Sequence, residues 1–523
     1  MRVLEFLILR RLASFAGALF CICFGVSCST SEAPPAQSAD PPQVDALKTE
    51  TFRNNEVSAN EIVFKVADCE TDDRTAFLAR VTNTARELAG EEDIEVSQVG
   101  NGCWFLARSS KKSASELLNP FLLQIEINRA AEPEFKQVPE IVDAEPNFII
   151  RLKPHHDDRP VQGSPDDDYF QRGELWGFVN QQYPDVHIDA LRAWQVSKGS
   201  QQIVVGVIDT GIYYLHPDLH ANVWCAPRDF TVTLGTDKIN CPSGSHGFNV
   251  VGRTDAERCD PLDGIRNPGH GTHVSGTIGA IGDNQRGVVG VNWTTRLLGL
   301  KFMKYGDGTA ANAKRAIDFA VELKKELKLD ADIRVLNVSW GYRSDVTTRS
   351  DSDMLREAIE DAGKKGILVV ASAGEDGGSN NDEIEHYPSG FNLENVVSVT
   401  AIDRKGLLAD RANYGMTSVH LSAPGSEIYS TYSMNLGYDY YVSGGTSMAA
   451  AFVSGAAALI LSVPECSKLS PADLKQMILR GVSSPPTPSS RPIPTSSGGM
   501  LDVYKSIEQC STEAVLKPFS RNH

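Results

Sequence analysis

The sequence predicts an α/β protein in which a mostly parallel sheet is flanked by helices, preceded by a small α+β domain. Short apolar runs alternate with helical stretches, as in a parallel sheet that is covered on both faces. A β-α-β-β order of patterns near the N-terminus predicts the smaller domain. The strand candidates of the sheet are the runs 203–208, 297–302, 335–338, 367–371 and 396–401.

Length, composition and charge limit the class of protein. A chain of 523 residues is long enough for two or more domains. A hydrophobic content of 41% and a charged content of 22% are ordinary for a globular protein. The net charge of -17 argues against nucleic acid as a partner, because nucleic-acid binding needs a basic face.

The N-terminus predicts export. Arg10 and Arg11 precede the apolar run 12–26, which is shorter than the ~20 residues of a membrane span and is typical of a signal peptide. We expect a signal over 1–28 and a secreted or periplasmic protein of the cell envelope. A second interpretation stays open, in which Cys28 is a lipoprotein acceptor and the protein is anchored to a membrane. Gly25 disfavours it, because lipoprotein signals usually carry Leu three residues before the cysteine.

Export permits disulfides. Cys69 and Cys103 form one expected pair, and Cys466 and Cys510 another. Cys225, Cys241 and Cys259 leave an odd number, so two of these three pair and the third is free or bonds outside its own domain.

The patterns divide the chain into segments. Phe77, Val81, Ala85 and Leu88 form one apolar helix face, and Asn101-Gly102 is a hairpin-type turn between two strand candidates. A second helix within 111–140 is uncertain. The expected segments are a linker over 29–58, a domain over 59–153, an exposed linker over 154–168, a large domain over 169–511 and a tail over 512–523.

Three short motifs carry the chemistry. Ser447 follows two glycines and precedes a run of small residues, where a helix N-terminus favours developing negative charge. Taken alone, a Gly-Thr-Ser turn before a buried helix is common. Asp209 closes the apolar run 203–208, and His270 opens another small-residue segment, so the order is Asp, His, Ser.

Together these segments closely resemble the subtilisin-like serine proteases, whose Asp-Thr-Gly, His-Gly-Thr-His and Gly-Thr-Ser-Met-Ala motifs they match over roughly residues 60 to 510. The resemblance implies that Ser447 attacks the scissile carbonyl, that His270 takes and returns the proton, and that Asp209 orients the imidazole. It also implies polypeptide substrates. The strand with Ser339, Trp340 and Gly341 would then pair with extended peptide, and Gly374 would face it across the primary pocket.

The N-terminal domain resembles the inhibitory propeptide of the same family, including its closing Glu145-Pro146-Asn147 strand. The resemblance implies a zymogen whose own propeptide is an intramolecular inhibitor and is cut off within 153–168. The alternative is a constitutive second domain. We expect a monomer.

One position departs from the family. Subtilisin-like enzymes usually place Asn after an Ala-Gly pair, where its amide donates to the oxyanion, whereas this chain has Glu375. An ionised carboxylate has no donor and repels the oxyanion, while a protonated Glu375 would donate. We therefore expect a reduced or acid-shifted rate; the alternative is that Asn380 or Asn381 fills the role. Glu375 and Asp376 also predict tolerance for Lys or Arg before the scissile bond.

Two sets of residues are candidate metal ligands. Asp218 and Asn284 match places near a calcium site of the family, so the resemblance implies a structural calcium there, and it implies no cofactor for the chemistry. A competing hypothesis takes His270 and His273 as metal ligands, but no further ligand completes a zinc set.

The sequence thus predicts an exported, self-processing serine endopeptidase. One rival is a peptide-binding pseudo-protease weakened by Glu375. Another is a peptide ligase that uses the same acyl-enzyme chemistry.

Overall fold

The computed structural model describes residues 49–52, 55–67, 69, 74–130, 140–151, 159–160, 169–264, 269–343, 353–433, 439–484 and 493–511. The predicted signal over 1–28 and the tail over 512–523 lie outside the described residues, as do Cys28 and most of the linker 154–168.

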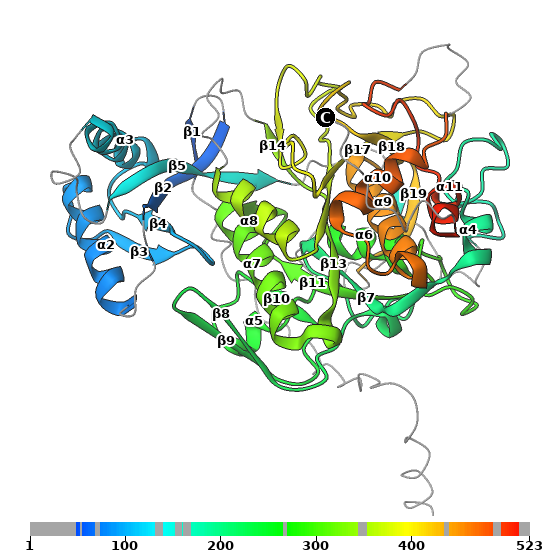
Figure 1. Ribbon diagram of the computed structural model, residues 1–523, viewed down its shortest axis with the longest axis horizontal. Coiled ribbons are helices and arrows are strands. Elements are labelled where there is room, and N and C mark those ends of the chain that lie inside the picture. The colour runs from blue at the N-terminus through cyan, green and yellow to red at the C-terminus, as the bar shows by residue number, and fades with distance from the viewer. Residues whose placement is uncertain are drawn as a thin grey trace, which may run out of the picture. The chain divides into compact units, whose positions relative to one another are not determined.

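A sheet of seven strands is the centre of the larger domain, and every pair of neighbours in it is parallel (Figure 1). The α/β fold class is therefore confirmed. In sheet order the strands are β10 (Gly247–Asn249), β11 (Thr294–Lys301), β7 (Gly199–Asp209), β13 (Ile333–Val338), β15 (Leu368–Ser372), β17 (Val396–Ile402) and β18 (Leu421–Pro424).

Both faces of this sheet are buried, which explains the unbroken apolar runs. Successive side chains of a strand point to opposite faces. In β7, Val204 and Ile208 accordingly belong to one apolar cluster, and Val205 and Val207 to another. The helices α7 (Ala310–Leu327) and α8 (Asp353–Lys364) contribute to the first cluster. The helices α6 (His270–Gly279), α9 (Thr446–Leu461) and α10 (Pro471–Arg480) contribute to the second.

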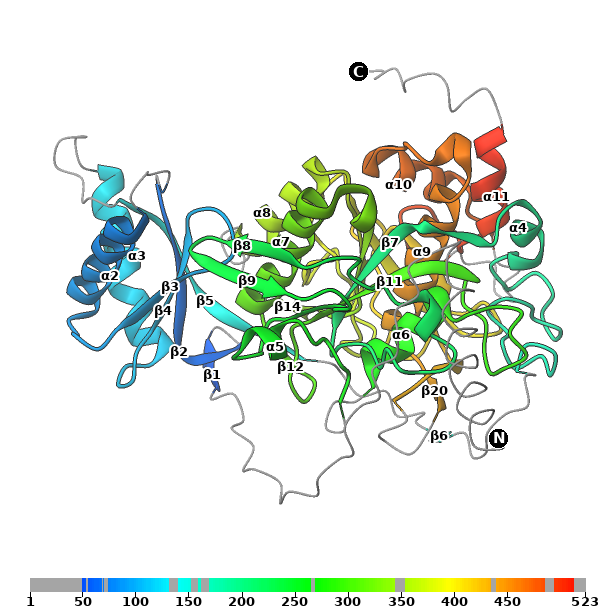
Figure 2. The same cartoon turned by 90° about the horizontal axis from the view of Figure 1, so that it is seen from below.

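The N-terminal domain is a small antiparallel sheet with two helices, α2 (Arg74–Ala89) and α3 (Ala114–Ala130) (Figure 2). Its strands are β1 (Thr49–Phe52), β2 (Asn55–Val66), β3 (Glu95–Gln98), β4 (Trp104–Arg108) and β5 (Ile141–Arg151). The helix α3 is the second helix of this domain, and it lies within the stretch 111–140. Strand structure begins at Thr49, so the predicted linker 29–58 extends too far at its C-terminal end; Val57 and Ser58 are buried in the sheet.

One strand of the larger domain joins the N-terminal sheet. The strand β12 (Asp307–Thr309) pairs antiparallel with the end of β5, with Gly308 opposite Ile150. The C-terminal end of the N-terminal domain therefore lies along an edge of the larger domain through main-chain hydrogen bonds.

The remaining elements are short. The strands are β6 (Arg159–Pro160), β8 (Phe230–Leu234), β9 (Asp237–Cys241), β14 (Tyr342–Arg343), β16 (His386–Tyr387), β19 (Ile428–Thr431) and β20 (Tyr440–Ser443). The helices are α4 (Ala190–Val196), α5 (Asp255–Arg258) and α11 (Val503–Glu508), with 3-10 turns at His220–Asn222, Lys328–Ala331, Pro464–Cys466 and Gln509–Ser511. Among the described helices, none is long and apolar enough to cross a membrane.

Three disulfides join described cysteines. Cys69–Cys103 and Cys466–Cys510 are confirmed, and Cys241–Cys259 is the pair formed from the remaining three. Cys225, the odd cysteine, is itself disulfide-bonded and so is not a free thiol.

Candidate active site

An acid and an imidazole meet at the carboxyl edge of the central sheet. Asp209 is the last residue of β7 and is fully buried. Both of its carboxylate oxygens lie 2.9 Å from Nδ1 of His270, the first residue of α6. The Thr210 amide also donates to Oδ1 of Asp209, at 2.7 Å. Because Nδ1 of the imidazole is held by the acid, Nε2 is the nitrogen that can exchange a proton with a reactant.

Glycines permit this close approach. Gly269, just before α6, has a φ of 68°, in the left-handed region that favours glycine. A Cβ on Gly271 would lie 2.1 Å from the carbonyl oxygen of Gly211 and 3.0 Å from Cβ of Asp209. The His-Gly pair of the motif is thus required by the contact between β7 and α6.

Two reciprocal hydrogen bonds place Ser447 at the start of α9. The hydroxyl of Ser447 donates to the carbonyl oxygen of Ser339 at 3.0 Å, and the Ser339 hydroxyl donates to the Ser447 carbonyl oxygen at 2.8 Å. Asn337 donates to the Ser339 hydroxyl at 2.9 Å and accepts from the Ser454 hydroxyl at 2.8 Å. This buried chain of bonds fixes the first turn of α9 against the end of β13.

A single pocket brings the predicted residues together. His270 and Ser447 line it, and so do the expected peptide-contacting residues Ser339, Gly341 and Gly374. Trp340 also contributes, but its indole is a core group that donates to the Ile208 carbonyl oxygen at 2.7 Å and is only 2% exposed. The full lining is His270, Ser339, Trp340, Gly341, Ser372, Gly374, Glu375, His386, Thr446 and Ser447.

Glu375 lies at the N-terminus of α9, the helix that carries Ser447. Its Oε1 accepts the backbone N–H of Thr446 at 2.6 Å. The residue that precedes α9, Gly445, has no side chain with which to cap the helix, and the first amides of a helix need an acceptor from elsewhere. Glu375 therefore caps α9 from a loop 71 residues away, and its carboxylate faces the positive end of the helix dipole.

Neither alternative asparagine lines the pocket. The side-chain amide of Asn381 donates to the Ala373 carbonyl oxygen at 2.8 Å, and that of Asn380 donates to Glu383 at 2.9 Å. Asp376 accepts from the Asn413 amide at 2.8 Å. The geometry thus places Glu375, rather than Asn380 or Asn381, beside Ser447.

The carboxylates around His270 change its acidity. Burial alone would lower its pKa, but the charge of Asp209 and its hydrogen bond, together with the charges of Glu375 and Asp263, outweigh burial and raise the pKa above its usual value. Sequence reasoning missed Asp263. Its carboxyl is fully buried, accepts the Thr272 hydroxyl at 2.7 Å, and has its pKa raised to about 6 by burial.

The comparisons with known proteins bear on this site. A model of the subtilase family matches residues 200–498, which is more than half of the chain. The chain belongs to the subtilase family. Its members are serine-type endopeptidases that need no cofactor for catalysis.

Relatives extend the similarity beyond the catalytic segment. The thermophilic serine proteinase of Bacillus sp. (strain AK1) is 34% identical over 325 residues, which cover 62% of this chain and 64% of that protein. The extracellular basic protease of Dichelobacter nodosus is 27% identical over 441 residues, which cover 78% of this chain and 64% of that protein. This subtilase thus spans just under two thirds of the length of both.

A solved structure shows the same fold. Fervidolysin of Fervidobacterium pennivorans, described as a keratinolytic enzyme related to subtilisin, superposes with a TM-score of 0.58 at 19% identity and covers 88% of this chain and 62% of its own. At this identity the likeness concerns the fold.

The expected calcium site is a hydrogen-bonded loop anchor in this subtilase. Oδ1 of Asp218 accepts the Asn284 amide at 2.5 Å, and Oδ2 accepts the Val288 N–H at 2.9 Å. Calcium takes six to eight oxygen ligands, and over the described ranges no group of three or more acidic, His or Cys residues converges. This arrangement does not fit a calcium ion.

The competing metal hypothesis for His273 is also at odds with the geometry. Its Nε2 lies 3.0 Å from the Ile428 carbonyl oxygen and 3.2 Å from that of Tyr441, and the side chain is fully buried. Burial and the neighbouring His270 lower its pKa to about 3. His273 is therefore a core residue that ties α6 to β19 and β20.

His386 is a pocket residue that the sequence did not single out. It is 2% exposed. A Cβ on Gly341 would lie 2.2 Å from its Cε1, and a Cβ on Gly374 would lie 2.6 Å from its Nε2. The imidazole therefore fills the slot between the two glycine walls and shortens the pocket. The local pattern of residues 384–390 does not predict this role, because His386 contacts Gly341 and Gly374, which lie elsewhere in the sequence.

We predict that Glu375 shifts the pH profile upward, which is opposite to the acid shift expected from the sequence, because its charge raises the pKa of His270. His270 must be neutral to accept a proton, so kcat/KM rises as the pH rises through its pKa. Removing the Glu375 charge with Glu375→Gln lowers that pKa and moves the rise to lower pH. Glu375→Asn does the same and also supplies a donor, which is worth roughly 10²–10³ in kcat in subtilisin. Both substitutions keep an acceptor oxygen but remove the negative charge at the N-terminus of α9, which costs about 0.3–1 kcal/mol of stability.

The measurement is kcat/KM against pH together with thermal melting of the three proteins. Asp410→Asn, an exposed acid that does not line the pocket, is the matched control. An unchanged midpoint in Glu375→Gln would show that the carboxylate does not act on His270.

A second prediction concerns pocket depth. His386→Ala opens the slot between Gly341 and Gly374, so the ratio of kcat/KM for Phe over Ala before the scissile bond rises about tenfold, as expected for burying part of an aromatic ring. Peptide p-nitroanilides measure the ratio. His420→Ala is the control, because His420 is a partly buried histidine away from the pocket. If the two variants give the same ratio, His386 does not limit the pocket.

Proposed function

We propose that the protein is an exported, self-processing serine endopeptidase that hydrolyses peptide bonds in polypeptides through Asp209, His270 and Ser447. The observation that carries the proposal is the Asp209–His270 pair, which lies at a pocket that Ser447 also lines. Membership of the subtilase family supports the same chemistry.

The proposed mechanism needs one rotation of a side chain, that of Ser447. The Ser447 hydroxyl turns from the Ser339 carbonyl oxygen toward Nε2 of His270, loses its proton to that nitrogen and attacks the scissile carbonyl carbon. His270 then protonates the leaving amine. Water next loses a proton to His270 and attacks the acyl-enzyme, and His270 returns that proton to Ser447 as the acid product leaves. Asp209 stabilises the imidazolium in both halves. Glu375 places a negative charge beside the developing oxyanion, and we expect it to slow both steps.

We infer that the N-terminal domain, whose strands begin at Thr49 rather than at residue 59, is an inhibitory propeptide and that the cut falls within 153–168. The pairing of β5 with β12 supports this, because it lays the end of the N-terminal domain, up to Arg151, along an edge of the catalytic domain. The register of β5 with Asp307, Gly308 and Thr309 is that of an added antiparallel strand. A constitutive second domain would show the same contacts without a cut, so the mass of the mature protein distinguishes the two.

Export to the extracellular space agrees with the name of the Dichelobacter relative, an extracellular basic protease. Anchoring through Cys28 and a monomeric state remain predictions.

Glu375 favours one second candidate, the peptide-binding pseudo-protease. A carboxylate that caps α9 stabilises the pocket while opposing an oxyanion, which suits a protein that binds peptide without turning it over. The bonded Asp209–His270 pair is the contrary observation, because a binding protein has no use for an oriented base.

We predict that Ser447→Ala abolishes maturation. The parent loses a fragment that ends within 153–168, and the variant stays at full length, because only Ser447 can form the acyl-enzyme. Intact mass of both proteins at pH 5 and pH 7.5 measures this. Cleavage of both proteins would mean that another protease processes the chain, and cleavage of neither would favour the pseudo-protease.

A further inference from the structure

A disulfide-bonded hairpin of the catalytic domain is not used by the proposed chemistry. β8 and β9 form an antiparallel pair, with Leu234 opposite Asp237 and a two-residue connection between them. Cys241, at the end of β9, is bonded to Cys259, which directly follows α5. We refer to residues 230–241 as the hairpin.

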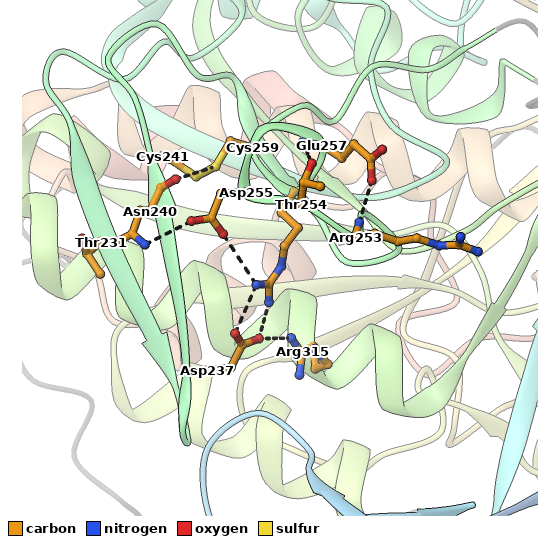
Figure 3. Close-up of polar contacts among 11 residues, drawn as sticks. Thr231, Asp237, Asn240, Cys241, Arg253, Thr254, Asp255, Glu257, Cys259 and Arg315 are labelled. Carbon is orange, nitrogen blue, oxygen red and sulfur yellow. Dashed lines mark hydrogen bonds and ion pairs between the residues drawn. A yellow bond between two sulfur atoms is a disulfide. The ribbon is translucent and has the colours of Figure 1, made fainter. Parts of the chain in front are cut away.

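Ion pairs and hydrogen bonds hold the hairpin in one place (Figure 3). The carboxylate of Asp237 pairs with Arg258 of α5 and, at 2.7 Å, with Arg315 of α7. Further along β9, the Asn240 amide donates to Asp255 at 3.0 Å. These bonds and the disulfide tie the hairpin to two helices of the catalytic domain, so its tip is a fixed surface rather than a loose loop.

That tip contacts the N-terminal domain. The carbonyl oxygen of Gly235 accepts Nη1 of Arg74 at 2.9 Å, and its N–H donates to Oδ1 of Asn101 at 3.4 Å. Gly235 has a φ of 61°, and a Cβ there would lie 2.3 Å from Oε1 of Gln98 and 3.0 Å from the carbonyl oxygen of Gly100. Glycine at the tip thus permits both the turn and the contact.

Asn101 is bonded to the catalytic domain through all of its polar groups. Its N–H donates to Asp318 at 2.6 Å, and its carbonyl oxygen accepts Nζ of Lys314 at 2.8 Å. Its side-chain amide donates to Glu322 at 3.2 Å, while the amide oxygen accepts the Gly235 N–H. The hairpin tip and α7 therefore form a socket for the turn at Asn101.

The floor of the socket is a buried ion pair. Lys314 and Asp318 lie 2.5 Å apart, with side chains that are 4% and 7% exposed. Each also bonds the backbone of Asn101. Charged groups this deeply buried need such partners, so the turn completes the hydrogen bonding of the pair as well as docking on it.

We propose that the hairpin is a second docking surface for the N-terminal domain, and that together with α7 it keeps this domain bound to the catalytic domain after the linker is cut. The proposal rests on the proposed function in one respect, because it assumes that the linker is cut before the N-terminal domain is released. The partner is this chain's own N-terminal domain, which contacts the surface through its turn at Asn101 and through Arg74. A slow release of the cleaved domain is the consequence, and it delays the opening of the pocket.

The experiment separates docking from self-cleavage. In the Ser447→Ala full chain, a recognition site for a viral protease is placed within 161–168, and that added protease makes the cut. The rate at which the N-terminal fragment leaves is then followed by size exclusion and by fluorescence anisotropy of a dye on its N-terminus. Failure of self-cleavage leaves this measurement unaffected.

Two matched pairs of variants test the two parts of the surface. Arg74→Ala removes the contact with the hairpin, and its control is Arg80→Ala, an exposed arginine on the same helix whose guanidinium lies over Phe77 of its own domain. Asn101→Asp places a carboxylate beside Asp318 and Glu322, and its control is Asn83→Asp on the exposed face of α2.

We expect release to be about threefold faster in Arg74→Ala and tenfold or more faster in Asn101→Asp, because an unpaired charge in a buried contact acts mainly on dissociation. The controls should release their fragment at the parent rate. If Arg74→Ala matches Arg80→Ala, the hairpin is not a docking surface. If Asn101→Asp matches Asn83→Asp, the socket does not hold the domain. Circular dichroism of each full chain confirms that it is folded.

Discussion

The end of β13 is bonded to the start of α9 through Ser339 and Ser447, and much of the site depends on that contact. Each serine donates its hydroxyl to the main-chain carbonyl of the other, and Asn337 and Ser454 extend the bonds into the core. The arrangement fixes where α9, the helix that carries Ser447, begins. Since β7 is the direct neighbour of β13, the same edge of the sheet carries Asp209, and His270 follows from the packing of α6 on β7.

Glu375 stabilises the N-terminus of α9, and we expect it to slow the proposed reaction. The amide of Thr446 needs an acceptor, and Gly445 offers no side chain for it. A carboxylate meets this need and stabilises the helix N-terminus. The same charge raises the pKa of His270 and, in the proposed mechanism, lies beside the developing oxyanion. Stability of the α9 terminus and speed of acyl transfer are therefore coupled through one side chain, and a substitution that improves one weakens the other.

The sequence predicts an element correctly where the residues that determine it lie within that element. The unbroken apolar run before Asp209 predicts a strand buried on both faces, and β7 has that form. The spacing of Phe77, Val81 and Ala85 predicts the buried face of α2. The three motifs, with the resemblance they carry, point to Asp209, His270 and Ser447, and the structure has His270 and Ser447 lining one pocket and Asp209 bonded to His270.

Long-range contacts could not be predicted in this way. The cap that Glu375 provides joins residues 71 apart, and nothing near Glu375 indicates an unsatisfied amide elsewhere. His386 fills a slot between Gly341 and Gly374, which lie on separate segments. The Asn101-Gly102 turn is visible in the sequence, but its four bonds to α7 and to Gly235 arise only when two domains meet. The end of the linker at 58 was misplaced for a similar reason, since β1 is a strand only through its pairing with β2.

The central claim is that Ser447 is a nucleophile made reactive by His270 and Asp209. Labelling the matured protein with a fluorophosphonate, followed by peptide mapping, tests it most directly, since the reagent captures a serine only where a base removes its proton. The account predicts one adduct per chain, on Ser447, formed at a rate that falls by at least 10³-fold in His270→Ala. An adduct on another serine, or labelling of Ser447 that does not depend on His270, would contradict it.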